Sequence, residues 1–198
     1  MIDYLDAHAD IGVLGPRLVL ADGKLDLACR RGEPNPATSF FHIFGLARIF
    51  PKSPIFARYN MTFLPEDQTA DVDSVVGACM LVRGEVLQKS GLMDEGFFMY
   101  GEDLDLNLRL KKLGYRVVYW PEVTVRHLKG TSTRKQPERM IRAFYDAMTV
   151  FHRKHFAARY PAPFNWLVYA AIAAVREYKL FRARITPAEK RVVGSART

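Results

Sequence analysis

The chain has 198 residues, 49% hydrophobic and 25% charged, a balance typical of a globular domain with a sizeable core and not of a disordered segment. It has two cysteines, Cys29 and Cys79, which excludes a disulfide scaffold or a cysteine-based zinc module, and we expect two free thiols in a reducing compartment. The net charge of +8 is uneven: residues 1–125 carry 13 basic and 17 acidic side chains, whereas residues 126–198 carry 16 and 4. The basic half predicts a polyanionic partner, whether phosphates, a membrane face or nucleic acid.

The first part of the chain alternates between strand-like patterns and irregular stretches. Residues 11–20 are apolar and β-like, and residues 72–83 look like a second, buried strand. Gly77 inside the second stretch leaves room for another part of the chain to approach its backbone closely. Residues 37–68 mix aromatics with prolines and predict short helices with irregular connections, and a short helix is expected over residues 84–90.

The next region gives the clearest local pattern. Leucines at helical spacing predict a helix over residues 102–113, and Gly114 is the expected stop. Residues 115–120 and 123–127 then look like two strands. We expect a break between them at Pro121, because proline cannot donate to the hydrogen-bond ladder of a sheet.

The basic C-terminal part predicts two helices, over residues 137–160 and 164–184. In the second helix, apolar and aromatic residues precede basic ones, as in a helix that lies on an anionic membrane face. A packed terminal helix with a solvated basic face fits the same pattern. Its apolar run, residues 166–175, is shorter than the roughly 20 residues of a membrane-spanning helix, and residues 1–10 lack the apolar core of a signal peptide.

Three carboxylates, Glu102, Asp103 and Asp105, stand where the helix over residues 102–113 is expected to begin. Acidic residues at such a position often only cap the helix and complement its dipole. Two features favour the rim of a pocket instead. The aromatic and glycine-rich segment 96–101 leads directly into the acids, and Arg109 lies four residues after Asp105, where it can hold that carboxylate.

Other common sites are excluded by their missing residues. Asp103, Asp105 and Asn107 match the opening of a calcium loop, but Leu108 replaces its glycine and Gly114 its bidentate glutamate. The sequence contains no phosphate-binding glycine loop and no nucleophile elbow. It also lacks a zinc finger, an RNA-binding aromatic motif and a helix-turn-helix signature, which argues against nucleic acid as the partner of the basic half.

His127 ends a predicted strand and faces a polar loop, the kind of position that lines ligand crevices in α/β folds. A lone histidine is more often structural than a ligand. Asp71 and Asp73 form a D-x-D pattern that resembles a metal–diphosphate motif. They stand at the start of the predicted buried strand, so we interpret them as turn residues at its edge.

Several motifs in residues 72–133 follow one another as in a known enzyme family. They are V-x-G-A-C around Gly77, F-F-x-Y-x-E-D-x-D-L-x-x-R at residues 97–109, G-Y-R-V-x-Y-x-P at residues 114–121, and His127 before a Ser/Thr loop. The region resembles the second half of inverting family 2 glycosyltransferases of the GT-A type, above all the rhamnosyltransferase-like members that build bacterial surface polysaccharides. Residues 10–36 are similar to the family's bridge between its nucleotide-binding and acceptor halves.

The resemblance implies an α/β fold, namely a partial GT-A (nucleotide-diphospho-sugar transferase-like) fold with a mixed sheet, flanking helices and a C-terminal helical extension. Residues 1–135 would form the acceptor-side part of the domain and residues 136–198 the basic helical extension. The family's nucleotide-binding half and its own D-x-D motif precede the bridge, so we expect this chain to lack them.

The family's functional residues map onto matching positions of this sequence. Asp103 would be the catalytic base that deprotonates the acceptor hydroxyl, and Glu102 would support it or contact the acceptor. Gly77 and Ala78 would line the sugar pocket. The other candidate substrate-site residues, which we expect to brace the helix, are Asp105 and Arg109.

The resemblance also implies partners. His127 would be a ligand of a divalent metal, Mn²⁺ or Mg²⁺, that neutralises the diphosphate. The donor would be a UDP- or dTDP-sugar, and the acceptor a lipid-linked or polysaccharide glycan. We expect the protein in the cytoplasm, peripheral at the inner face of the plasma membrane. The alternative is a non-catalytic remnant that acts as a membrane- or partner-binding module.

Overall fold

The computed structural model describes residues 1–128 and 137–185. They form two compact units. One contains residues 1–94 and 102–128, and the other contains residues 95–101 with the helices that follow residue 136. The boundary predicted at residue 135, the Ser/Thr loop after His127 and the chain beyond residue 185 lie outside the described residues.

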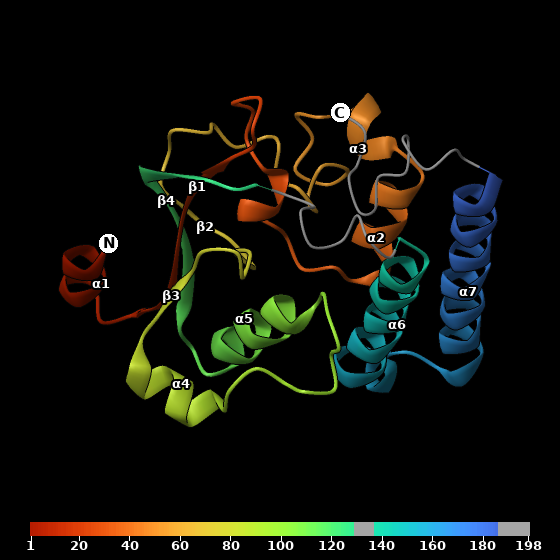
Figure 1. Cartoon of the computed structure of the whole chain (residues 1–198). Helices are drawn as coiled ribbons and strands as arrows, with labels where there is room; N and C mark the ends of the chain where they lie inside the picture. The colour runs from red at the N-terminus through yellow and green to blue at the C-terminus, as the bar shows by residue number, and fades with distance from the viewer. Residues whose placement is uncertain (129–136, 186–198) are drawn as a thin grey trace. The chain divides into compact units, whose positions relative to one another are not determined.

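A mixed sheet of four strands forms the centre of the first unit (Figure 1). Its strands run in the order β2-β4-β1-β3, with β1 and β4 parallel and both edge strands antiparallel to their neighbours. Their bounds are Ile11–Val19 for β1, Ala70–Asp71 for β2, Leu81–Val82 for β3 and Arg116–Arg126 for β4. With helices beside this sheet, the predicted α/β class with a mixed sheet is confirmed.

The continuous strand predicted over residues 72–83 is wrong, because only Leu81 and Val82 of this stretch belong to a named strand. Val72 donates its N–H to the carbonyl of Val117 in β4, and Asp73 and Ser74 bond to the backbone of Arg31, but the backbone of Val75 and Gly77 bonds to side chains. The carbonyl of Val75 accepts hydrogen bonds from Asn107 and Arg31, and the N–H of Gly77 donates to a carboxylate. These side-chain partners hold the segment as a loop beneath α5, Glu102–Lys112.

The break predicted at Pro121 is also wrong, because β4 continues through it as one strand. The irregularity appears in the register. Pro16 of β1 pairs with Trp120, but the next residue, Arg17, pairs with Thr124. The residues between Trp120 and Thr124 therefore form a bulge, which accommodates a proline that has no N–H to offer the ladder.

The predicted helices of the first unit match the structure closely, whereas α1 and η1 were not predicted. Glycines with positive φ, Gly91 and Gly114, follow α4 and α5, as expected of helix stops. Asn35 caps α2 by accepting the N–H of Thr38. The helices other than α5 are α1 Ile2–Ala7, η1 Leu27–Cys29, α2 Pro36–Ile43, α3 Leu46–Ile49 and α4 Gly84–Ser90.

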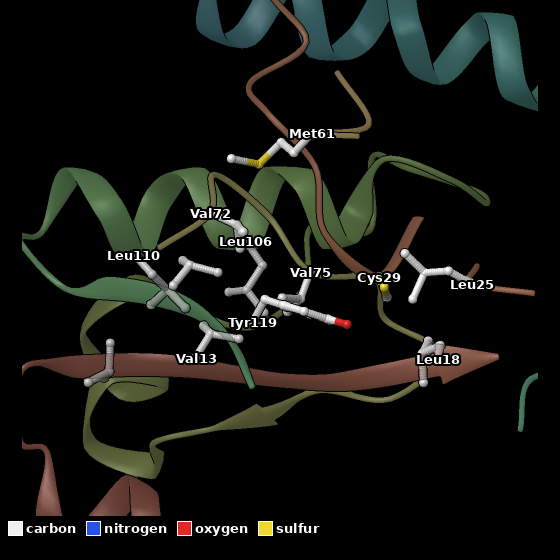
Figure 2. Packing of buried hydrophobic residues seen from close by; sticks show 12 residues of the cluster. Val13, Leu18, Leu25, Cys29, Met61, Val72, Val75, Leu106, Leu110 and Tyr119 are labelled. Atoms are coloured by element: carbon white, nitrogen blue, oxygen red, sulfur yellow. The ribbon is translucent and has the colours of Figure 1, made fainter. Parts of the chain in front are cut away.

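The core of the first unit lies between the sheet and α5 (Figure 2). Leu106 and Leu110 of α5 pack against Val13 of β1 and Tyr119 of β4. Alternate residues of β4 point to the other face, where Val118 joins a second cluster with side chains of α1 and β1. The period-2 alternation of β4 thus buries both faces of the sheet.

The second unit contains two long helices that pack against each other, α6 (Pro137–His155) and α7 (Ala162–Ile185), joined through η2 (Ala157–Arg159). Asn165 links them, because its Oδ1 lies 2.8 Å from Nε2 of the buried His152 and its Nδ2 donates to the carbonyls of Ala157 and Tyr160. Within the described part of the chain, no helix combines the length and apolar character needed to cross a membrane.

Candidate active site

The first turn of α5 carries the two candidate catalytic carboxylates. Glu102 and Asp103 are the first two residues of the helix, so their charges lie at the positive end of its dipole. The chain enters α5 through a sharp turn in which Tyr100 and Gly101 both have positive φ. A non-glycine residue in this conformation costs about 1–3 kcal/mol and is typical of functional segments.

Asp103 is almost completely buried and hydrogen-bonded through both carboxylate oxygens. Its Oδ2 lies 2.7 Å from a guanidinium nitrogen of Arg31 and accepts the backbone N–H of Gly77 at 3.0 Å. Its Oδ1 accepts the N–H of Leu104 at 2.7 Å. Arg31 and Gly77 thus fix the direction in which Oδ1 points.

Arg31 is a site residue that the sequence reasoning missed. It lies in the loop after η1, and its guanidinium also donates to Ser74 Oγ and to the carbonyl of Val75, both at 3.4 Å. Burial alone would lower the pKa of Arg31, but the charges and hydrogen bonds of Asp103 and Tyr59 outweigh it and raise the pKa. A pair of residues 72 positions apart leaves no local signal, so only the fold shows it.

Gly77 and Ala78 form an exposed turn beside Asp103. A Cβ atom added to Gly77 would lie 3.4 Å from the Cβ of Asp103, which confirms the predicted close approach. Asn107, one turn further along α5, donates to the backbone carbonyl of Asp103 at 2.6 Å and to that of Val75 at 3.4 Å. The turn and the carboxylate are therefore held together by one buried polar network.

Glu102 has a different environment from Asp103. Its Oε2 is buried and has no hydrogen-bond partner among the described residues. Burial raises the pKa of Glu102, and the nearby charge of Asp103 adds to this effect. Two adjacent carboxylates in different environments are an arrangement that separates proton-transfer roles in enzymes.

Asp105 and Arg109 brace α5. Asp105 is fully buried, and its Oδ2 lies 2.8 Å from Nε of Arg109. The guanidinium of Arg109 also donates to the carbonyls of Ser90, Gly91 and Leu92. The pair thereby ties the helix to the segment after α4, the bracing that the i, i+4 spacing predicted.

His127 forms a separate pair with a carboxylate. Its Nδ1 lies 2.7 Å from Oδ2 of Asp26, which is buried at the start of η1, while the imidazole is partly exposed. Such a bond orients an imidazole so that Nε2 can face a metal ion, and it fits the predicted ligand role. Within residues 1–128 and 137–185, no group of three or more His, Cys, Asp or Glu side chains could hold a metal.

The D-x-D pattern has the structural role that the sequence indicated. Asp71 pairs with Arg116 of the neighbouring strand, at 2.7 Å. Asp73 pairs with Arg58 and Lys111 and accepts the N–H of Glu33. Both residues therefore anchor the edge of the sheet and the loop that follows it.

Residues 52–146, which include the candidate site residues from Gly77 to His127 but not Arg31 or Asp26, match a family described as "Glycosyltransferase like family 2". This match assigns residues 52–146 to the family 2 glycosyltransferases. The resemblance seen in its motifs is thereby confirmed, and the observed sheet and helices agree with a partial GT-A fold. The family generally uses a divalent metal.

By their names, the curated relatives of the chain are rhamnosyltransferases and an O-antigen biosynthesis protein. The chain is 29% identical over 191 residues, 96% of its length, to an N-acetylglucosaminyl-diphospho-decaprenol L-rhamnosyltransferase of Mycobacterium tuberculosis. It is 31% identical over 126 residues to the O-antigen biosynthesis protein RfbC of Myxococcus xanthus, covering 63% of the chain and 9% of that protein. It is 40% identical over 65 residues to the rhamnosyltransferase WbbL of Escherichia coli, covering 31% and 25%. The chain spans 61% of the length of the mycobacterial relative.

Proposed function

We propose that the chain is the acceptor-side part of an inverting glycosyltransferase of cell-surface polysaccharide synthesis. It would transfer a sugar, rhamnosyl by analogy with the relatives' names, from a UDP- or dTDP-sugar to a lipid-linked or polysaccharide acceptor. The observation that carries the proposal is the Asp103 carboxylate. It lies at the start of α5, held by Arg31 and Gly77 beside an exposed turn.

Asp103 is the proposed catalytic base. As the acceptor oxygen attacks the sugar carbon and the nucleotide diphosphate leaves, a carboxylate within hydrogen-bond reach takes the hydroxyl proton. Oδ2 is engaged by the Arg31 guanidinium, so Oδ1 is the oxygen that would receive the proton. Gly77 and Ala78, at the exposed turn, would line the sugar pocket.

Glu102 is the proposed supporting carboxylate. Its unpartnered Oε2 can accept a hydrogen bond from an acceptor hydroxyl, which would relieve the cost of leaving a buried oxygen unsatisfied. Its raised pKa also increases its proton affinity. The variants below decide which of the two carboxylates takes the proton.

His127 is the proposed metal ligand of this chain, held by Asp26 through Nδ1. A bound divalent cation, Mn²⁺ or Mg²⁺, would neutralise charge on the leaving diphosphate. Asp26 would set the tautomer and orientation of the imidazole, so its loss would weaken metal binding even though it touches no substrate.

Peripheral attachment to an anionic membrane, at the inner face of the plasma membrane, is part of the proposal. α7 exposes large apolar side chains at helical spacing, with Leu167, Phe181 and Ile185 each at least 60% exposed. Arg182 and Arg184 stand in its last turn. A helix with an apolar face and neighbouring cations is suited to the headgroup region of an anionic bilayer.

The test is sugar transfer by the chain with UDP- and dTDP-sugars, Mn²⁺ and a polyprenyl-diphosphate-linked N-acetylglucosamine acceptor. Asp103→Asn should reduce the rate about 100-fold or more, whereas Glu122→Gln, an exposed carboxylate on β4, should leave it unchanged. A larger loss from Glu102→Gln than from Asp103→Asn would transfer the base role to Glu102.

A non-catalytic module is the second candidate, and the exposed apolar face of α7 is the observation that favours it. Calorimetry with the same nucleotide sugars and Mn²⁺ separates the two candidates. Metal-dependent donor binding supports the transferase. Absence of both binding and transfer, together with retained vesicle binding, would replace it with the membrane-binding module.

A further inference from the structure

A small pocket lies within the second unit. It has a volume of about 270 Å³, small for a ligand pocket. The turn at Gly96–Phe98 forms one wall and successive turns of α6 form the other. Every lining residue belongs to the same compact unit, so the pocket does not depend on how the two units are arranged.

The pocket combines an apolar floor with a cationic rim. Its apolar lining comes from Phe97, Phe98, Ala143, Ala147 and Val150, and its basic lining from Arg139 and Arg142. The Arg139 guanidinium lies over the ring of Phe98, 4.7 Å from its centroid. This cation–π contact holds the Arg139 guanidinium against the aromatic wall of the pocket.

The one acidic lining residue does not cancel this charge. Asp146 lies 3.1 Å from the guanidinium of Arg176 on α7, so its negative charge is already paired. Arg142 is exposed, and no salt bridge to it is found among the described residues. Arg142 therefore presents positive charge at the rim that an anionic ligand can neutralise.

We propose that this pocket binds the diphosphate and the first isoprene unit of a polyprenyl-diphosphate acceptor. Arg142 and Arg139 would contact the phosphate oxygens, because guanidinium groups pair with phosphates through two hydrogen bonds. The apolar floor of Ala143, Ala147 and Val150 would contact the start of the hydrocarbon chain. The inference rests on the proposed function for the identity of the acceptor, and a mixed apolar and cationic pocket matches an amphiphilic anion better than a free sugar phosphate.

The first experiment measures binding of farnesyl diphosphate to the full chain by calorimetry, below its micellar concentration. Farnesol and inorganic pyrophosphate are tested separately, to supply the apolar chain alone and the diphosphate alone. We expect farnesyl diphosphate to bind most tightly. Equal affinity for pyrophosphate would overturn the assignment of a lipid ligand. Equal affinity for farnesol would overturn the role of the diphosphate, and would indicate that an apolar surface such as α7 binds the hydrocarbon.

The second experiment uses variants of the pocket lining at Arg142, which is exposed, and at Ala143, which is half-buried. Arg142→Gln should weaken farnesyl diphosphate binding about tenfold and leave farnesol binding unchanged. Ala143→Glu should weaken it further by filling the floor with a negative charge. Arg153→Gln removes the same charge from α6 outside the pocket lining and should have no effect. An equal loss from Arg153→Gln, or none from the two pocket variants, would overturn the proposal.

Neither binding experiment needs a donor or turnover, so its failure is distinct from failure of the proposed transferase. Transfer to a soluble acceptor sugar, with lipid binding absent, would leave the transferase standing and overturn the pocket. Lipid binding without transfer would support the pocket and count against catalysis by this chain. If Arg142→Gln leaves the KM for the lipid-linked acceptor unchanged, the pocket is not the acceptor site.

Discussion

The Arg31 guanidinium lies 2.7 Å from Oδ2 of Asp103, and both side chains are at most 10% exposed. The pair joins the loop after η1 to the first turn of α5, and the N–H of Gly77 donates to the same oxygen. The carboxylate is therefore oriented by two segments that are distant in the sequence. This geometry makes Arg31 a positioning residue in the proposed reaction.

Removing the partner of a buried charge should cost stability. We expect Arg31→Ala to lower the free energy of unfolding by about 3–5 kcal/mol, because it leaves the Asp103 carboxylate buried and unpaired. Urea denaturation followed by circular dichroism measures this loss. The double variant Arg31→Ala with Asp103→Asn should recover a large part of it, and losses that add strictly from the two single variants would show that the pair is not coupled.

The stability of the chain should depend on the protonation of Glu102. Its pKa is raised above the ordinary value of 4.5, so the folded state holds this proton to higher pH than the unfolded state does. The stabilising contribution of the neutral form is fully present below pH 4.5 and is lost as the pH rises through the raised value. Glu102→Gln should therefore flatten this part of the stability–pH curve. The same slope in wild type and variant would assign the effect to another group.

Gly32 is a position where a side chain cannot fit. A Cβ atom there would lie 2.3 Å from the backbone carbonyl oxygen of Arg58, which cannot rotate away as a side chain can. We expect Gly32→Ala to cost about 1–3 kcal/mol. Gly84→Ala, at the first residue of α4, meets no atom within 4 Å and should be neutral or stabilise the protein by about 0.5–1 kcal/mol. Thermal unfolding compares the two.

The exposed face of α7 should bind anionic vesicles. Co-sedimentation with phosphatidylglycerol-containing liposomes should fall about tenfold or more in the double variant Phe181→Ser with Ile185→Ser. Each substitution removes a large apolar side chain that would be buried in the bilayer. Leu92→Ser, which removes an apolar side chain of the first unit that is even more exposed, is the control. Unchanged sedimentation of the α7 variant would refute membrane attachment through this face.

The sequence alone determined the local elements of the protein. Leucine spacing and Gly114 defined α5, and the apolar run at residues 11–20 defined β1. Such patterns can be read without a fold, because the period of a helix or strand is set by a few neighbouring residues. The ordered motifs also identified the family, and with it Asp103 and Glu102 as candidates.

The tertiary structure decided which distant residues support those candidates. It brought Arg31 to Asp103 and Asp26 to His127, pairs separated by 72 and 101 positions. It also turned residues 72–80 into a loop, although their apolar pattern favoured a strand. That pattern reports burial, and Val72 and Val75 are indeed buried. It does not report whether the backbone continues as a strand or, as at Val75 and Gly77, bonds to the side chains of Arg31 and Asp103.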